Sequence, residues 1–312
     1  PSPAERTWDP ALSASRAKEY ERCPLQYRLH VVDGYREPES RAKALGTLVH
    51  AVLEDLFSLP PLSRTRDAAR ARLAPAFEAL TQKNPEVAAL FDDEADREAW
   101  LEDARSVVDG YFAIEQPQWI APAAREARVT ATTKGGVRLL GFIDRVDRAP
   151  DGRLRVVDYK TGRKTFDLTD IWNGMGLQML LYLFTLEREG EALYNREIIP
   201  AGVLYLPARD AVVAGSRAMS EAERRRKVDA ELRRRGIVLD EPEVLAAMEE
   251  PGEAGIRFLP VKVNKAGAIT GEALVSAERL GKLARHTGRI LEEIGRELAA
   301  GNIAADPFWR GP

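Results

Sequence analysis

The stretch GFIDRVDRAPDGRLRVVDYKTG, residues 141–162, predicts two β-strands joined by a tight turn. Its centre, Pro150, Asp151 and Gly152, suits a three-residue hairpin loop, because Pro opens a type I turn and Gly accepts the left-handed conformation. Upstream, the run REARVTATT (125–133) predicts a third strand of the same antiparallel meander. A helix at about 173–189 and an apolar strand at 201–208 are expected downstream. This order of elements predicts an α/β core.

The hairpin loop fixes the register of the two strands around it. If Ala149 pairs with Arg153, counting inward places Asp144 directly opposite Asp158 on one face of the sheet. Lys160 stands two residues beyond Asp158, so the period-two pleat points both side chains to the same face. The sequence therefore predicts two carboxylates and an ammonium group in one place.

Two neighbouring carboxylates need a compensating charge. At a separation of ~5 Å they repel by roughly 3 kcal/mol at an effective dielectric constant of about 20. Lys160 offers one positive charge for two negative ones, whereas a hard divalent cation suits oxygen ligands, which favours Mg²⁺ or Mn²⁺. Such a cation beside a lysine polarises a phosphodiester, helps to deprotonate an attacking water and stabilises the charge that builds on the phosphate. The indicated reaction is phosphodiester hydrolysis.

The tripeptide Asp-x-Lys on its own is more often an exposed ion pair on a strand. Apolar residues flank it here: Leu154, Val156 and Val157 on one strand, and Phe142, Ile143 and Val146 on the other. Because these residues bury both strands, charges that serve only the surface are not expected between them, and a site is favoured.

Composition excludes several classes of protein. The 312 residues carry 46 Lys and Arg against 49 Asp and Glu, a formal net charge of -3, so a purely electrostatic nucleic-acid binder is not expected. The single cysteine excludes a disulfide framework and suits the cytoplasm. No apolar run approaches the ~20 residues that cross a bilayer, and there is no phosphate-binding loop of an ATP-driven motor.

The remaining segments are mainly helical. Ser13 is a candidate N-cap, the run 44–57 has apolar residues at helical spacing, and residues 62–116 continue this pattern with breaks at two prolines. We expect a basic helix at 219–235, a short helix at 242–249, a strand at 256–264 and an amphipathic helix at 276–300 around the core. The organisation expected is a helical N-terminal region at 1–122, a core with the catalytic motifs at 123–215, and elements at 216–312 that complete the same domain.

Six ordered blocks resemble a known family. They are LSASRAKEYERCPLQYRL (12–29), GTLVH (46–50), GFIDRVD (141–147), VVDYKTG (156–162), QMLLY (178–182) and GNIAADPFW (301–309). Together they resemble the RecB-type branch of the PD-(D/E)XK nucleases, and most closely the C-terminal nuclease domain of AddB-type helicase-nuclease subunits. The resemblance implies a restriction-endonuclease-like core, with a central mixed sheet flanked by helices.

The resemblance also implies roles for individual residues. It implies that Asp144 and Asp158 bind a metal ion together with His50 and the backbone carbonyl of Tyr159, that Lys160 is the catalytic lysine, and that Gln178 and Tyr182 form the family's Q-x-x-x-Y pair. Residues four apart on a helix share a face, so Gln178 and Tyr182 can together hold Lys160 or a DNA phosphate. The alternatives are plain packing of Gln178 and Tyr182, and a hydrogen-bonded core histidine at position 50.

Cys23 departs from the AddB-type pattern. In that pattern an early cysteine joins three cysteines beyond the tail motif to hold a [4Fe-4S] cluster, and Cys23 has no such partners here. The cluster cannot be built from these residues alone. We expect it only if a longer parent chain supplies the missing cysteines, which favours a truncated chain.

The run ERRRKVDAELRRRG (223–236) offers a second candidate contact with nucleic acid. Arg224, Arg225, Arg226 and Lys227 would follow backbone phosphates if the helix lay beside the active site. The alternative is a solvated helix face, since acidic residues interrupt the run.

The function expected is that of a magnesium-dependent DNA nuclease. The resemblance implies an exonuclease that acts on single-stranded ends delivered by an AddA-type helicase-nuclease partner, in double-strand break repair and recombination. Two alternatives stay open: a non-catalytic nucleic-acid-binding or scaffold module that kept the fold, and a sequence-specific restriction endonuclease.

Overall fold

The fold is described from a computed structural model. It describes residues 11–149, 151–194, 199–209, 211, 213–215, 219–249, 256–264 and 266–309. The helices are α1 (Ala14–Arg22), α2 (Pro24–Tyr27), α3 (Arg41–Leu56), α4 (Arg66–Arg70), α5 (Leu73–Lys83), α6 (Glu94–Ile114), α7 (Leu168–Trp172), α8 (Gln178–Tyr194), α9 (Glu221–Glu231), α10 (Pro242–Met248) and α11 (Ala277–Ala299). The strands are β1 (Pro122–Thr132), β2 (Arg138–Arg148), β3 (Arg153–Lys160), β4 (Ile199–Pro207), β5 (Arg235–Leu239), β6 (Lys262–Val263), β7 (Ile269–Thr270) and β8 (Leu274–Val275).

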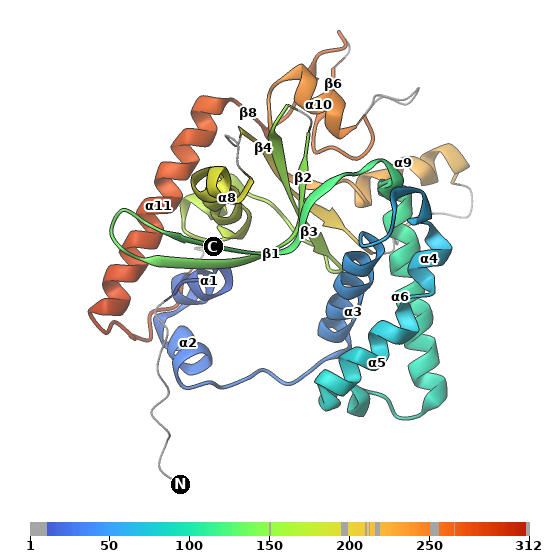
Figure 1. Cartoon of the computed structure of the whole chain (residues 1–312), viewed down its shortest axis with the longest axis horizontal. Helices are drawn as coiled ribbons and strands as arrows, with labels where there is room; N and C mark the ends of the chain where they lie inside the picture. Colours follow the sequence, from blue (N-terminus) through green and yellow to red (C-terminus); the bar gives the residue numbers. More distant parts are fainter. Residues whose placement is uncertain are drawn as a thin grey trace.

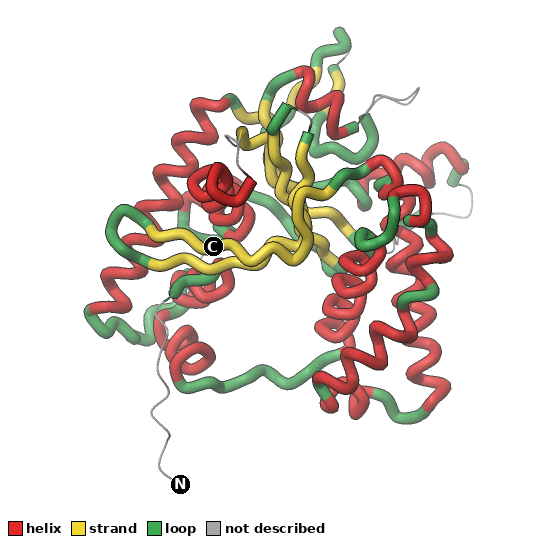
Figure 2. Tube along the Cα trace, in the orientation of Figure 1, coloured by secondary structure: helices red, strands yellow, loops and turns green. Residues whose placement is uncertain are grey.

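A six-stranded mixed sheet forms the centre of the molecule (Figure 2). Its strand order is β1-β2-β3-β4-β5-β8. The meander of the first three strands is antiparallel, as expected, whereas β4 runs parallel to β3 because helices α7 and α8 carry the chain back across the sheet. The predicted fold class, a mixed sheet flanked by helices, is confirmed.

The hairpin between β2 and β3 has the predicted register. The amide of Ala149 donates to the carbonyl of Arg153 at 2.9 Å. Pairs continue from Arg148 with Leu154 inward to Arg145 with Val157. The ladder ends there, one step before Asp144, so Asp144 lies where the two strands begin to separate.

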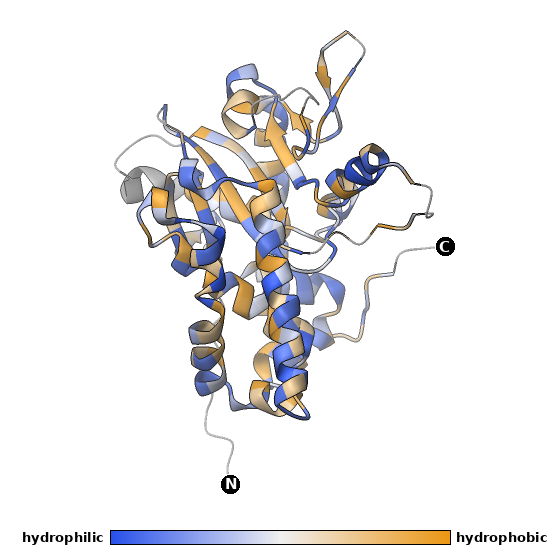
Figure 3. Cartoon of the chain, turned by 90° about the vertical axis from the view of Figure 1, so that its right-hand side faces the viewer, coloured by the Kyte–Doolittle hydropathy of each residue, from blue (hydrophilic) through white to orange (hydrophobic). Residues whose placement is uncertain are grey.

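Helices cover both faces of the sheet (Figure 1). Helices α1, α8 and α11 pack on one face, around Val156 and Val203, whereas α3 to α6 pack on the other, around Val157 and Tyr159. Successive residues of β3 thus pack into two separate apolar cores, because side chains alternate between the two faces of a pleated strand. In Figure 3 the strands are mainly hydrophobic and the outer helix faces hydrophilic, so burial of both sheet faces stabilises the layers.

Two expectations for the C-terminal third were wrong. The basic helix ends at Glu231 rather than at residue 235, and Arg235–Leu239 forms strand β5 of the central sheet. At Gly236, a Cβ atom would lie 1.9 Å from the carbonyl oxygen of Val203, so only glycine lets the chain pass this close to β4. Strand β5 belongs to the core rather than surrounding it.

The strand expected at 256–264 is reduced to two residues. Only Lys262–Val263 pairs, with Ile269–Thr270, in a separate two-stranded sheet. The amides of Phe258 and Leu259 donate instead to the carboxylate of Glu249. The Glu249 carboxylate thus accepts the hydrogen bonds that a partner strand would otherwise accept from the Phe258 and Leu259 amides, and these residues need not join the central sheet. Helix α8 also begins later than expected, at Gln178, because the short helix α7 and a turn precede it.

A buried ion network ties the layers together. The guanidinium of Arg145, with its side chain 0% exposed, pairs with Glu115 at the end of α6 at 2.8 Å and with Asp147 at 2.8 Å. Arg234 and Arg155 reach the same Glu115 carboxylate at 3.3 and 3.5 Å. Burial alone would raise the pKa of Glu115, but Arg145, Arg234 and Arg155 lower it to about 2.

Replacement of Glu115 by Ala is expected to lower the free energy of unfolding by about 3–5 kcal/mol, because three guanidiniums would lose the carboxylate that compensates their burial. Glu102→Ala, on the exposed side of the same helix, is the matched control and should cost less than about 1 kcal/mol. Urea denaturation followed by circular dichroism measures both. Equal losses in the two variants would contradict a structural role for the network.

Candidate metal centre and active site

The candidate site lies where the long β1–β2 ribbon bends away from the rest of the sheet (Figures 1 and 2). Asp144 on β2 lies one residue beyond the last β2–β3 register pair, and its Oδ2 atom accepts a hydrogen bond from the backbone amide of Tyr159 at 2.7 Å. Glu126 on β1 has a positive φ of 41°. Among the described residues, every other residue with a positive φ is a glycine. The strained backbone and the separating strands open room for side chains at this point.

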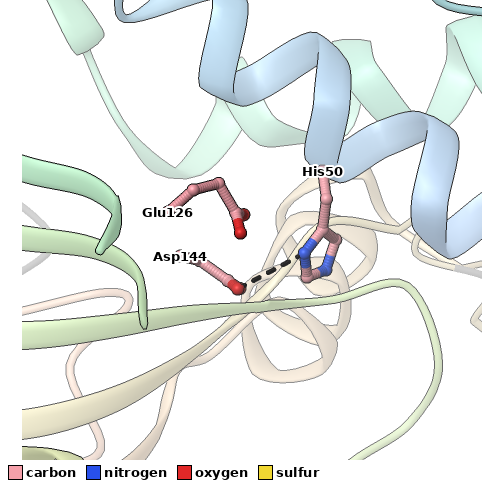
Figure 4. Close-up of side chains that lie close together, drawn as sticks. All are labelled: His50, Glu126 and Asp144. Atoms are coloured by element: carbon pink, nitrogen blue, oxygen red, sulfur yellow. Dashed lines mark ion pairs between the residues drawn. The ribbon is translucent and has the colours of Figure 1, made fainter. Parts of the chain in front are cut away.

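Three side chains from three elements converge there (Figure 4). His50 from α3, Glu126 from β1 and Asp144 from β2 each offer a ligand atom, and these atoms all lie within 4.8 Å of one another. All three residues are half-buried. The group therefore combines restricted solvent access with enough room to share one ligand.

The imidazole of His50 is held in one orientation. Its Nε2 lies 2.9 Å from the carbonyl oxygen of Tyr159, a distance at which Nε2–H donates to that oxygen. Its Nδ1 then faces the Asp144 carboxylate at 3.4 Å. A histidine that donates one N–H to a carbonyl keeps the lone pair of the other nitrogen for a metal ion. In this arrangement the Tyr159 carbonyl orients the histidine. The predicted role of that carbonyl as a metal ligand stays a prediction.

The second acid forms its own contacts beside this group. Asp158, with only 2% of its surface exposed, accepts a hydrogen bond at Oδ1 from the Gln178 amide at 3.1 Å. Its Oδ2 is in ion-pair contact with the Lys160 ammonium and accepts no well-formed hydrogen bond from the described residues. The Gln178 amide also lies 3.3 Å from the Tyr182 hydroxyl. The structure thus brings the four predicted residues Asp158, Lys160, Gln178 and Tyr182 together.

The carboxyl groups are crowded without enough positive charge. Burial, and then the Asp144 carboxylate, raise the pKa of Asp158 to about 6. Burial, Asp144 and Glu54 raise the pKa of Glu126 to about 7. Burial opposes charge on His50, but its contacts with Asp144 and the nearby Asp158 raise its pKa overall. Burial is the largest cause for both carboxyl groups, and the neighbouring negative charge that adds to it is what a bound cation would relieve.

The donor set fits a divalent cation. One imidazole nitrogen and several carboxylate oxygens suit Mg²⁺, Mn²⁺ and related ions, whereas thiolate-preferring metals have no partner among these side chains. The Oδ2 atom of Asp158 is in ion-pair contact with Lys160, and the Asp144 carboxylate adds negative charge beside it. A cation held here would sit beside Lys160, which pairs with Asp158.

Comparison with known proteins assigns the fold to a family. The family model described as the PD-(D/E)XK nuclease superfamily matches residues 11–310. The chain belongs to the PD-(D/E)XK nuclease superfamily. This confirms the resemblance expected from the six sequence blocks, and nucleases of this superfamily use divalent metal ions.

Several similar proteins are AddB-type subunits of an ATP-dependent helicase/deoxyribonuclease. The relative from Acetivibrio thermocellus is 25% identical over 327 residues, covering 96% of this chain and 28% of its own length. Those from Symbiobacterium thermophilum and Desulforudis audaxviator are 36% and 34% identical, over 57% of this chain and 16% of their own lengths. This PD-(D/E)XK chain therefore spans less than a third of each of these relatives.

Glu126 was not predicted as a member of the site. A signal for it was present, because Lys134, Gly135 and Gly136 form a second hairpin turn that joins β1 to β2. Counting inward from the pair of Thr132 with Arg138 places Glu126 opposite Asp144. The same counting from a hairpin turn that places Asp158 on β3 opposite Asp144 would have placed Glu126 on β1, the strand on the other side of β2.

Gly141, the first residue of the family block GFIDRVD, makes room for Tyr182. A Cβ atom at this position would lie 2.4 Å from a ring carbon of the tyrosine. The tyrosine is buried against the bent ribbon, where its hydroxyl meets Gln178. A glycine here therefore lets helix α8 approach β2 closely enough to reach Asp158.

The predicted nucleic-acid contacts on α9 lie on an exposed helix. Arg224, Arg225, Arg226 and Lys227 are all exposed. Arg225 pairs with Glu221 at 3.7 Å and Lys227 with Glu223 at 3.4 Å, one turn away in each case. These pairs are typical of a solvated helix, and the role of the four residues in binding nucleic acid stays a prediction.

Cys23 lies between α1 and α2, beside the C-terminal segment of the described chain. The amide of Phe308 donates to the carbonyl of Arg22 at 2.7 Å, and the amide of Leu25 donates to the carbonyl of Ala304 at 3.1 Å. The cysteine is free. Its role as an iron-sulfur ligand stays a prediction. No helix in the described ranges is long and apolar enough to cross a membrane.

Divalent cations are expected to bind this nuclease domain more weakly as the pH falls through about 7 and then about 6, because protons compete for Glu126 and Asp158 in that range. Calorimetric titration with Mn²⁺ in buffers of different ionisation enthalpy measures both the affinity and the protons released. Glu126→Gln should weaken binding and release fewer protons, whereas Glu102→Gln should change neither. An affinity that stays constant from pH 5 to 8 would exclude these carboxylates as ligands.

Proposed function

We propose that this chain hydrolyses phosphodiester bonds of DNA and that Mg²⁺ or Mn²⁺ is its metal ion. One observation carries the proposal: a group with the chemistry of a cation site, His50, Glu126 and Asp144, stands beside the ion pair of buried Asp158 with half-buried Lys160. Hydrolysis of a phosphodiester needs both parts, because negative charge builds on the phosphate as water attacks.

The residues divide the work by their chemistry. His50, Glu126, Asp144 and Asp158 would hold the metal ion, which when bound polarises the phosphate and lowers the pKa of water. The Lys160 ammonium would face the non-bridging phosphate oxygens and stabilise the added charge. Gln178 and Tyr182 act through Asp158, because their hydrogen-bond chain fixes the carboxylate that positions the lysine.

The wider role follows from the relatives. Their name joins a helicase to a deoxyribonuclease, and this chain corresponds to a minor part of their length. We therefore propose that the chain is the exonuclease domain of an AddAB-type helicase-nuclease in the cytoplasm, acting on single-stranded DNA ends in double-strand break repair. An AddA-type partner and other segments of a longer chain would supply the ATP-driven motor, and additional cysteines would complete a [4Fe-4S] cluster with Cys23.

Asp158→Asn and Lys160→Ala are each expected to lower the rate of magnesium-dependent DNA degradation by at least about 100-fold. Asp158→Asn removes a carboxylate charge that would hold the metal ion and position Lys160, and Lys160→Ala removes the positive charge that would stabilise the phosphate. Release of nucleotides from end-labelled single-stranded DNA measures the rate. Asp103→Asn and Lys83→Ala, at exposed positions of α6 and α5, are matched controls.

Thermal melts should show that both active-site variants remain folded. Undiminished cleavage by both would exclude the mechanism. Wild-type protein that binds DNA but does not cleave it with Mg²⁺ or Mn²⁺ would favour the non-catalytic module. Defined fragments from a circular plasmid would favour the restriction endonuclease.

A further inference from the structure

A basic hollow adjoins the candidate active site. It has a volume of about 230 Å³, and Lys160 forms part of its wall. The other cationic side chains that line it are Arg163, Lys164, Arg209, Arg233 and Arg235. Glu231 is the acidic residue of its lining. The hollow therefore carries a clear surplus of positive charge next to the proposed catalytic lysine.

The hollow continues the row of site residues across the sheet. Asp158 on β3 is the register partner of Tyr205 on β4, and Tyr205 is the partner of Arg235 on β5. Register partners on neighbouring strands share a face of the sheet and lie ~4.8 Å apart. The backbone of Arg235 is thus about 10 Å from that of Asp158. One face changes from acidic to basic over this distance.

Tyr205 forms the floor between the two parts. The ammonium nitrogens of Lys160 and Lys164 lie 5.5 and 5.6 Å from the centre of its ring. Burial lowers the pKa of Lys164, and so do the like charges of Lys18 and Lys160. Two ammonium groups over one ring repel each other, and an anion between them would relieve the repulsion.

The one acid of the lining does not neutralise these groups. Glu231 pairs with Arg209 at 2.8 Å and with Arg163 at 3.3 Å. Within the described ranges, no carboxylate lies at ion-pair distance from Lys164 or Arg235. These two cations differ from Arg225 and Lys227 on α9, which each pair with a glutamate one turn away. The hollow rather than helix α9 presents cations that an external anion can engage.

We propose that this hollow is a subsite for a backbone phosphate of the nucleic-acid strand, adjacent to the phosphate that reacts beside Lys160. The inference rests on the proposed function and adds the path of the strand: from the metal group, past Lys160 and over Tyr205, to Lys164 and Arg235. Guanidinium and ammonium donors are the groups that bind phosphate oxygens best. They fix the position of the strand without reading its sequence.

The subsite is tested by Lys164→Gln and Arg235→Gln, singly and together. Affinity for a single-stranded oligonucleotide is measured in EDTA, where no cleavage occurs, at several salt concentrations. Loss of one phosphate contact should lower the slope of log K against log salt by about 0.7 for a single strand. Because both cations would contact the same phosphate, we expect that full change in the double variant and no more than that in either single variant. Lys282→Gln and Arg105→Gln, at exposed positions that pair within their own helices, are the matched controls.

Neutral linkages locate the phosphate. A single methylphosphonate, which removes one backbone charge, is moved along the oligonucleotide. At the position that occupies the hollow it should weaken binding by the wild type but not by the double variant. Oligonucleotides with a 5′-phosphate or a 5′-hydroxyl distinguish an internal phosphate from a terminal one. A difference confined to the end group would overturn the assignment to an internal phosphate.

The outcomes separate this inference from the proposed function. Unchanged affinity and salt slope in Lys164→Gln and Arg235→Gln would overturn the subsite, and so would a loss confined to an Arg224→Gln, Arg226→Gln variant of α9. Mn²⁺ affinity should stay at the wild-type value in the hollow variants, which shows that the metal group is intact. If the wild type does not cleave DNA with Mg²⁺ or Mn²⁺, or if Asp158→Asn and Lys160→Ala both cleave it at the wild-type rate, the proposed function or its mechanism fails whatever the binding data show.

Discussion

The buried guanidinium of Arg145 is the constraint on which the site depends. A charge with no exposed surface must be compensated, and Glu115, Asp147 and the Tyr159 hydroxyl surround it. These partners come from the end of α6, from β2 and from β3, so the guanidinium determines how the helical layer sits on the sheet. Asp144 is the preceding residue and meets the amide of Tyr159, while Arg145 meets the hydroxyl of the same tyrosine. The network on one face thereby positions the acid on the other.

The face of the sheet that carries the candidate site changes in charge along its length. The Glu126 and Asp144 carboxylates stand at one end, the Asp158–Lys160 pair is in the middle, and at the other end stand Lys164 and Arg235, which meet no carboxylate of the described residues. The fold tolerates this arrangement because the strained, separating strands and the buried network hold the groups in place. Such preorganised charge suits a reaction in which a metal ion and a polyanionic strand must meet.

The sequence predicted the parts of this site that local geometry determines. One hairpin loop sets the register of β2 and β3, so Asp144, Asp158 and Lys160 could be placed by counting. His50 is 109 residues from its partner Tyr159, and only the family resemblance identified it. Glu126 was missed because the register argument was applied to one hairpin and not to the next, and because nothing in its neighbours signals the bent backbone.

Strand β5 and the basic hollow were harder to predict, for a physical reason. Five residues that follow a polar helix carry too little apolar pattern to predict a strand. A glycine is needed at position 236 because the backbone of β4 lies so close, and the sequence alone does not show that contact. The cations of the hollow come from loops and from the ends of β3 and β5, so their meeting is a property of the sheet order. The run of arginines on α9 was the more visible signal in the sequence, but Arg225 and Lys227 there are matched by acids of the same helix.

The long separation between His50 and Tyr159 has a consequence for the assembly of the protein. The meander β1–β2–β3 closes through short turns and is expected to form early, with Glu126, Asp144 and Asp158 already aligned. The histidine arrives only when α3 docks, since closing so long a loop costs entropy that tertiary packing must first repay. A chain caught midway in folding would therefore have these carboxylates in place but lack the imidazole of the candidate metal site.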